Sequence, residues 1–181
     1  AKRLRKAGVT RLVVPEAFAY GEQLEKVGVA PVSTLPLRRA LAADLARAVM
    51  AGRNLSGGSA RLAVAGDQLS GELVRTVTEL ALRHRYLLLE VPCGGEELCR
   101  RLRREYGVSV LLHPAPGEAA DAQIAFDPAE CRGESFLPLY DETLPMPHLI
   151  LPPELESRLP EGADRGQLLS VLWEMGALRP G

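Results

Sequence analysis

The spacing of apolar positions changes along residues 60–90, which read ARLAVAGDQLSGELVRTVTELALRHRYLLLE. A short apolar run at residues 61–65 is typical of a buried strand, and a second such run follows at residues 86–91. Between them, residues 70–84 carry apolar side chains at helical spacing, with charged residues on the other side. We interpret this stretch as one β-α-β unit around which the rest of the chain is organised.

The same alternation continues beyond this unit. Residues 95–106 predict a helix, and residues 108–112 and 122–126 predict two further strands. Strands joined by helices of this length run parallel, with right-handed crossovers that place helices on the faces of the sheet. The pattern therefore predicts an α/β protein with a three-layer, mostly parallel, doubly wound sheet.

The first 52 residues predict a β-α-β-α portion. Its strand, interrupted helix, second strand and longer amphipathic helix are expected at residues 10–15, 16–27, 29–33 and 34–52. The Gly/Ser-rich segment 53–59 (RNLSGGS) predicts a linker to a core at residues 60–127. Because the leading portion is too short to bury much core alone, we expect one domain over residues 1–181.

Residues 128–181 predict a proline-rich C-terminal arm followed by a terminal helix. The repeated prolines exclude a long helix before Asp164, and an edge strand is expected at His148–Leu151. Asp164 is a typical N-cap, and Gln167 occupies the position that completes a capping box. The side of this helix expected to be buried carries Leu168, Leu169, Leu172 and Met175.

Composition limits the partners and the compartment. A formal net charge of −1 provides no overall field to attract nucleic acid or an anionic membrane. The three cysteines form no CxxC pair, which argues against a disulfide framework or a four-thiolate zinc site and fits the cytoplasm. No membrane span or signal peptide is visible, although the chain opens within a basic, helix-like phrase, AKRLRKAG, which weakens the second point.

The turn after the first strand of the β-α-β unit carries the candidate chemistry. Gly66 and Gly71 match the first and last glycines of GxGxxG, and Glu90 ends the next strand 24 residues after Gly66. Together with the later phrase ADAQIAF, residues 60–127 resemble a Rossmann-type dinucleotide-binding domain. This resemblance implies NAD(P) as the cofactor, with the binding residues Gly66, Asp67, Ser70, Gly71 and Glu90. Glu90 would be the acid that bonds a ribose hydroxyl.

The turn departs from the family pattern at its centre. Gln68 stands where a glycine normally lets the diphosphate approach the backbone. The neighbouring Asp67 opposes an anion by an energy on the order of a few kcal/mol at close range. The favoured interpretation is that Gly66 and Gly71 serve turning and packing only, with Asp67 or Ser70 as an N-cap, so that no cofactor is expected. A triphosphate-binding loop is not favoured, because Glu72 replaces its lysine.

Other candidate groups carry weaker signals. Cys93 lies near the start of a predicted helix, where free amides could activate a thiol, but Glu96 and Glu97 counteract them and a packed or capping thiol is favoured. His113 follows a predicted strand, at the end of a parallel sheet where ligands bind, although a loop histidine without a role is the simpler interpretation. The three histidines are too dispersed to predict a metal site, and none is expected. The arginine-rich helix at residues 100–104 lacks interleaved aromatic residues, so nucleic-acid binding is not favoured.

These observations favour a non-catalytic binding or assembly module of the cytoplasm with a degenerate cofactor loop. The alternative is a nucleotide- or dinucleotide-binding protein, or a domain derived from an oxidoreductase. The apolar C-terminal arm and the short helix around Trp173 predict a homo-oligomer, since another subunit could cover them.

Overall fold

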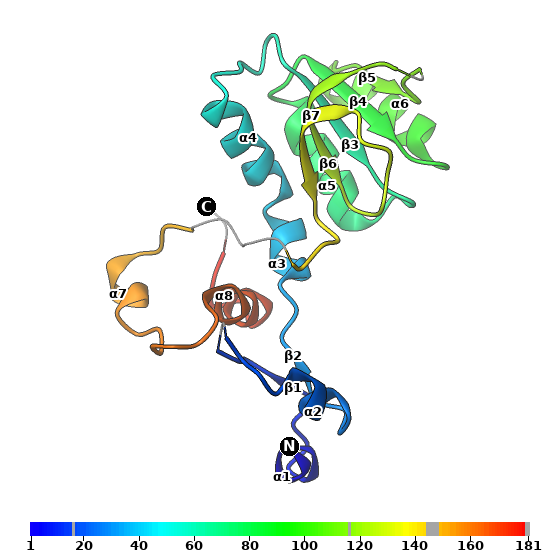
Figure 1. The fold of residues 1–181 in the computed structure, drawn as a ribbon. Helices are drawn as coiled ribbons and strands as arrows, with labels where there is room; N and C mark the ends of the chain where they lie inside the picture. Colours follow the sequence, from blue (N-terminus) through cyan, green and yellow to red (C-terminus); the bar gives the residue numbers. More distant parts are fainter. Residues whose placement is uncertain (16, 116, 144–148, 180–181) are drawn as a thin grey trace. The chain divides into compact units, whose positions relative to one another are not determined.

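The computed structural model describes residues 1–15, 17–115, 117–143 and 149–179 (Figure 1). The sequence predicts one domain with a linker at residues 53–59, but the contacts divide the chain into two compact units, Ala1–Leu37 with Leu144–Gly181, and Arg38–Thr143. The expected linker lies inside the second unit. There the backbone N–H of Arg85 donates to the carbonyl of Gly57, and the Arg53 side chain donates to the carbonyl of Asp121.

The second unit contains a five-stranded sheet in which every strand pair is parallel. Its strands, in the order β5-β4-β3-β6-β7 across the sheet, are β3 (Arg61–Ala65), β4 (Tyr86–Glu90), β5 (Val110–Leu112), β6 (Ala120–Ala125) and β7 (Gly133–Pro138). The chain winds outward from β3 to β5, then returns to the other side of β3 and continues to β7. This parallel, doubly wound order confirms the predicted Rossmann-like α/β fold class.

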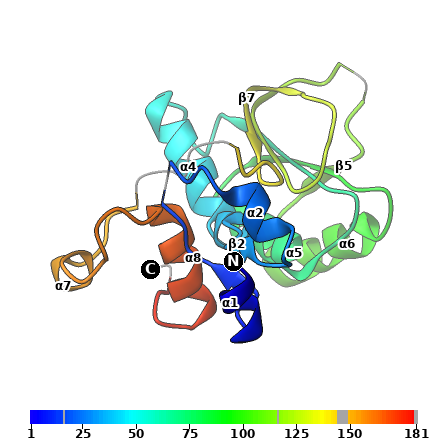
Figure 2. The same ribbon diagram turned by 60° about the horizontal axis from the view of Figure 1, so that its bottom comes forward.

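Three helices cover one face of this sheet: α4 (Ala42–Gly52), α5 (Gly71–Ala81) and α6 (Gly95–Tyr106). A Cβ built on Gly95 would lie 2.4 Å from Cδ1 of Leu112, so α6 packs closely on the face to which Leu112 points. Helix α5 contacts both α4 and α6, which places all three in one layer (Figure 2). The alternating apolar residues of the strands therefore bury one side against helices.

The opposite face is crossed by the connections between β5 and β6 and between β6 and β7. Among the described residues, neither connection contains a helix. Gln123, which is fully buried in β6, holds the second connection: its side-chain carbonyl accepts from the N–H of Arg132 at 2.6 Å, and its amide donates to the carbonyl of Glu130 at 2.9 Å. The connection between β6 and β7, hydrogen-bonded to the buried side chain of Gln123, thus covers part of this face, where a parallel sheet usually has a helix.

Strand β7 is absent from the sequence prediction, which places no strand between residue 126 and His148. Pro128 and Pro138 made the region resemble a loop, yet Pro138 is the last residue of an edge strand, where its missing N–H is tolerated. A Cβ on Gly133 would lie 2.8 Å from the backbone nitrogen of Gln123, so a glycine allows β7 to begin so close to β6.

The helices of the second unit begin and end near their predicted positions, with one exception. The helix predicted after Thr34 is divided at Leu41 into α3 (Leu35–Ala40) and α4. Helix α6 has its predicted bounds, and Ser70 caps α5, since its hydroxyl oxygen accepts from the N–H of Leu73 at 3.1 Å.

The first unit has a small core of its own, formed by Val14, Leu24 and Val29. Its two short strands, β1 (Arg11–Leu12) and β2 (Ala30–Pro31), are parallel. Its helices are α1 (Lys2–Lys6), α2 (Gly21–Glu25), α7 (Pro153–Glu156) and α8 (Arg165–Glu174). This separate core explains why the leading residues do not join the large sheet.

Helix α8 differs in part from its prediction. Asp164 caps it, accepting from the N–H of Gln167 at 2.8 Å, as expected. However, the side-chain carbonyl of Gln167 accepts from the N–H of Val14 instead of completing a capping box. Leu169 is buried, but Met175 is 75% exposed rather than buried. Residues 149–151 are not in a strand, and His148 lies outside the described residues.

Within the described ranges, no helix is both long enough and apolar enough to cross a bilayer.

Candidate functional site

The carboxyl ends of the central strands bring several of the predicted residues together. Backbone hydrogen bonds tie these ends to one another, from Gly66 N to Glu90 O at 3.0 Å and from His113 N to Leu89 O at 3.1 Å. A pocket of about 270 Å³ lies there, and its lining includes Gly66, Asp67, Glu90 and His113. Ser70 and Gly71, the remaining predicted residues, do not line it.

Gly66 has a packing role. A Cβ at this position would lie 2.6 Å from Cδ1 of Leu73 in α5, so only a glycine lets the helix approach the end of β3 this closely. Gly71 is different, because a Cβ there would meet nothing within 4 Å. The packing role expected for both glycines therefore holds for Gly66 and not for Gly71.

A carboxylate of the protein itself occupies the turn that a diphosphate would approach. Oδ2 of Asp127, just after β6, accepts from the backbone N–H of Asp67 at 3.0 Å. Gln68, at the position of the missing glycine, is exposed to solvent. The backbone donor of the turn is thus satisfied by Asp127, and a ligand anion would have to displace a like charge.

One guanidinium, that of Arg39, balances the acidic groups around this turn. Nη2 of Arg39 donates to the carbonyl of Phe126 at 2.9 Å and lies 3.9 Å from Oδ1 of Asp127. Nη1 lies 3.8 Å from a carboxylate oxygen of Glu72 on α5. Two carboxylates thus share one cation, and Asp67, whose N–H bonds Asp127, adds a third acidic residue to the turn, an arrangement that disfavours a further anion.

Glu90, the residue predicted to bind a ribose, forms a two-pronged ion pair with Arg132. Nε of Arg132 donates to Oε2 at 2.9 Å, and Nη2 donates to Oε1 at 3.1 Å. Nη1 donates to the carbonyl of Ala115, so one guanidinium joins β4 to both connecting loops. The hydrogen bonds and charge of Glu90 raise the pKa of Arg132, whose side chain is only 10% exposed. A ribose hydroxyl would have to compete with this pair for Glu90.

A second pocket brings together two residues that are distant in sequence. Cys93 and His113 both line a pocket of about 370 Å³ at the start of α6, together with Glu96, Glu97 and Arg100. Cys93 is exposed, and His113 has a φ of 50°. The sequence treats these two residues as separate candidates, but the ends of β4 and β5 place them at the same pocket.

Sequence reasoning missed Arg39, Asp127 and Arg132. Nothing in their local pattern distinguishes them from solvated loop or helix residues. Gln123 offered a usable signal, because an amide within the apolar strand ADAQIAF has to find hydrogen-bond partners once it is buried.

The described residues contain no group of three or more His, Cys, Asp or Glu that could hold a metal ion. Their three cysteines, Cys93, Cys99 and Cys131, are free, and burial raises the pKa of the Cys99 thiol.

No known protein family, no curated protein and no solved structure matches the chain. The residues of the site are therefore the basis of any functional conclusion.

Proposed function

We propose that this chain is a non-catalytic binding or assembly module that retains a Rossmann-like sheet without a working cofactor loop. The observation that carries the proposal is the hydrogen bond from the Asp67 N–H to the Asp127 carboxylate. In dinucleotide-binding proteins the amides of this turn bind phosphate, whereas here one of them binds a carboxylate of the protein.

The pairing of Glu90 with Arg132 supports the same proposal. A ribose-binding acid needs a free oxygen that faces the ligand, but both oxygens of Glu90 accept from one guanidinium. That guanidinium also fixes the two loops that cover the open face of the sheet. The carboxylates of Glu90 and Asp127 thus both have structural partners within the chain.

One observation favours the alternative, a nucleotide- or dinucleotide-binding protein. The strand order reverses between β3 and β6, and open parallel sheets bind ligands at such a switch point. Gly66, Asp67 and Asp127 lie there, and α5 begins directly after the turn. If an anionic ligand displaced Asp127, the positive end of the α5 dipole could stabilise its charge.

Thermal unfolding of the full chain with NAD, NADP, ATP or S-adenosylmethionine distinguishes the two. A ligand at about 100 times its dissociation constant adds roughly 2.7 kcal/mol, which raises Tm by roughly 5–10 °C in a chain of this size. We expect no shift with any of the four. A reproducible rise with one of them would support the alternative and contradict the proposal.

The same protein provides a test of assembly. We expect light scattering over a range of concentrations to show self-association through the apolar C-terminal arm. A monomer at every accessible concentration would argue against a homo-oligomer. The cytoplasmic location stays a prediction from the cysteine content.

A further inference from the structure

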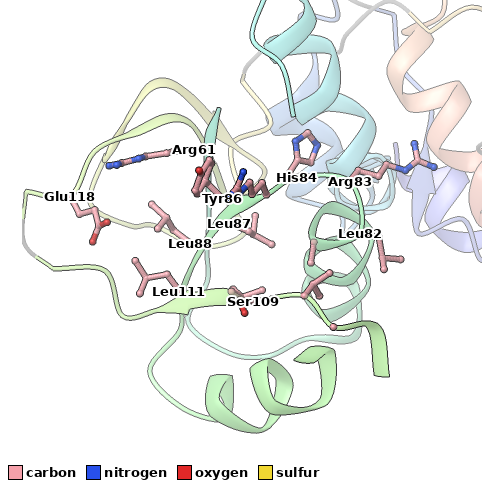
Figure 3. A pocket seen from close by; sticks show the side chains of 15 residues that line it. Arg61, Leu82, Arg83, His84, Tyr86, Leu87, Leu88, Ser109, Leu111 and Glu118 are labelled. Atoms are coloured by element: carbon pink, nitrogen blue, oxygen red, sulfur yellow. The ribbon is translucent and has the colours of Figure 1, made fainter. Parts of the chain in front are cut away.

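An open groove lies at the other end of the sheet, where β3, β4 and β5 begin (Figure 3). Its volume is about 730 Å³, and it is lined in part by the turns that precede β4 and β5, including His84 and Gly107. The groove is remote along the strands from Gly66 and Glu90, neither of which lines it. It is therefore separate from the degenerate cofactor site.

The floor of the groove is an apolar strip on the face of the sheet opposite the helices. Leu88 pairs with Leu111 in the sheet register, and because Leu112 packs against α6, its neighbour Leu111 points away from that helix. Figure 3 shows Leu88 and Leu111 side by side. Tyr86, two residues before Leu88, lies on the same face. Tyr86 is 43% exposed and Leu111 is 47% exposed, whereas Leu88 is buried at 4%.

Exposure of Tyr86 and Leu111 is unexpected in a parallel sheet, which normally has both faces covered. The loop held by Gln123 and Arg132 covers part of this face near Glu90. The connection from Leu112 to Ala120 is too short to contain a helix of ordinary length. The position that a crossover helix would occupy over the start of β4 and β5 is thus left to loops and solvent.

The margin of the groove is mainly positive. Arg61, Arg83 and Arg85 line it, against the single carboxylate of Glu118. None of these three arginines forms an ion pair in the part of the chain that the structure describes, and the guanidinium carbon of Arg85 lies 5.4 Å from the centre of the Tyr86 ring. A carboxylate oxygen of Asp121 accepts from the backbone N–H of Arg61, yet the lining itself holds three arginines against one acid. The groove therefore combines an apolar floor with an excess of positive charge.

We propose that this groove binds an amphipathic helix of a partner protein, which lies across β4 and β5 in place of the missing crossover helix. Aliphatic side chains of that helix would contact Tyr86 and Leu111, and its acidic side chains would face Arg61 and Arg85. The inference deepens the proposed function, on which it rests, by naming the surface and the chemistry of the partner.

The test uses the full chain and a fluorescent designed peptide of about 15 residues, the length at which an isolated helix becomes marginally stable. Leucines form one stripe of the peptide and glutamates flank it, while a matched peptide carries lysines in place of the glutamates. By fluorescence anisotropy we expect the acidic peptide to bind about tenfold more tightly than the basic one, and to weaken as salt rises.

Two kinds of variant locate the site. Leu111→Glu places a charge on the floor and is expected to weaken acidic-peptide binding about tenfold or more. The control Tyr20→Glu, at a position 63% exposed in the other unit, should leave binding unchanged. The double variant Arg61→Glu/Arg85→Glu should favour the basic peptide instead. Thermal unfolding of each variant shows whether it is folded.

Failure of the acidic peptide to bind, equal binding of the two peptides, or indifference to Leu111→Glu would each overturn the inference. Self-association that Leu111→Glu abolishes would show that a second copy of the chain occupies the groove, which also overturns it. These results are independent of the cofactor test, because a thermal shift with NAD would contradict the proposed function without changing peptide binding.

Discussion

The carboxylate of Asp127 accepts a hydrogen bond from the backbone N–H of Asp67 at 3.0 Å and thereby joins the turns that follow β3 and β6. These are the two strands between which the strand order reverses. The contact occupies a backbone N–H at the place where a parallel sheet of this kind would receive a ligand. Arg39, 3.9 Å from the same carboxylate, limits the cost of placing it next to Asp67.

Replacing Asp127 should reveal what this contact contributes to stability. Asp127→Ala removes the acceptor for the Asp67 N–H and the counter-charge of Arg39, and we expect it to lower the free energy of unfolding by about 1–2 kcal/mol. Asp127→Asn keeps an acceptor oxygen and should cost less. Urea unfolding of the two variants measures the difference. Equal losses would show that the hydrogen bond to Asp67 contributes nothing of its own.

The two glycines of the turn should respond oppositely to the same substitution. Gly66→Ala would place a methyl group 2.6 Å from Cδ1 of Leu73, and overpacking of this kind typically costs about 1–3 kcal/mol. Gly71→Ala enters open space at the start of α5, and we expect it to be neutral or to stabilise by about 0.5–1 kcal/mol. Thermal unfolding of both variants tests this. A destabilising Gly71→Ala would point to a contact of Gly71 with something other than this chain.

The sequence predicts the sheet well because the signals that specify it are local. Residues 61–65 and 86–90 are apolar runs with a capped helix between them, and right-handed crossovers leave few arrangements of such units. Helix α6 keeps its predicted bounds because Gly107, at a φ of 69°, ends it. Strand β7 escaped prediction because it ends in Pro138, which a strand tolerates at an edge, and an edge is a property of the whole sheet.

The candidate site is predicted only in part, because some of its contacts depend on the whole fold and not on local sequence. That Gly66, Glu90 and His113 share one end of the sheet follows from the register of parallel strands, which a strand prediction already contains. That Asp127 accepts from the Asp67 N–H and that Arg132 pairs with Glu90 depends on how connections without helices fold back over the sheet. No periodic pattern encodes those connections. The division into two units was equally hidden, since it depends on contacts between residues as far apart as Val14 and Gln167.

The pair Glu90–Arg132 should be strongly coupled. Arg132 is nearly buried and bonds Glu90 at two points, so Arg132→Gln leaves a partly buried carboxylate without its partner, at a cost of about 2–3 kcal/mol. Arg132→Lys should restore little, because an ammonium cannot bond both oxygens in the same way. A double-mutant cycle with Glu90→Gln measures the coupling.

The exposed pair Glu97–Arg100 on α6 provides a matched control for that cycle. Its two charges are also bonded, but both side chains are largely in water, so its coupling should be only about 0.3–0.5 kcal/mol. If the coupling at Glu90–Arg132 is no larger than in this control, the connection between β6 and β7 is held by Gln123 and not by the ion pair.

His84 should make the stability of the fold depend on pH. It is buried, and neither ring nitrogen has a hydrogen-bond partner among the described residues. Burial, followed by the charges of Arg47 and Arg83, lowers the pKa of His84 below its ordinary value of 6.5. The folded state therefore binds a proton less readily than the unfolded chain, in which this histidine titrates normally.

The sign of the effect follows from that difference in proton binding. As pH falls through 6.5, His84 binds a proton in the unfolded chain but not yet in the folded chain. The free energy of unfolding therefore decreases. The decrease should end once pH drops below the lowered pKa of the folded state. Urea unfolding of the wild type and of His84→Gln, measured in steps from about pH 8 to pH 5, isolates the contribution. The wild type should lose more stability than the variant over this range, and parallel curves would show that His84 is protonated as easily in the fold as outside it.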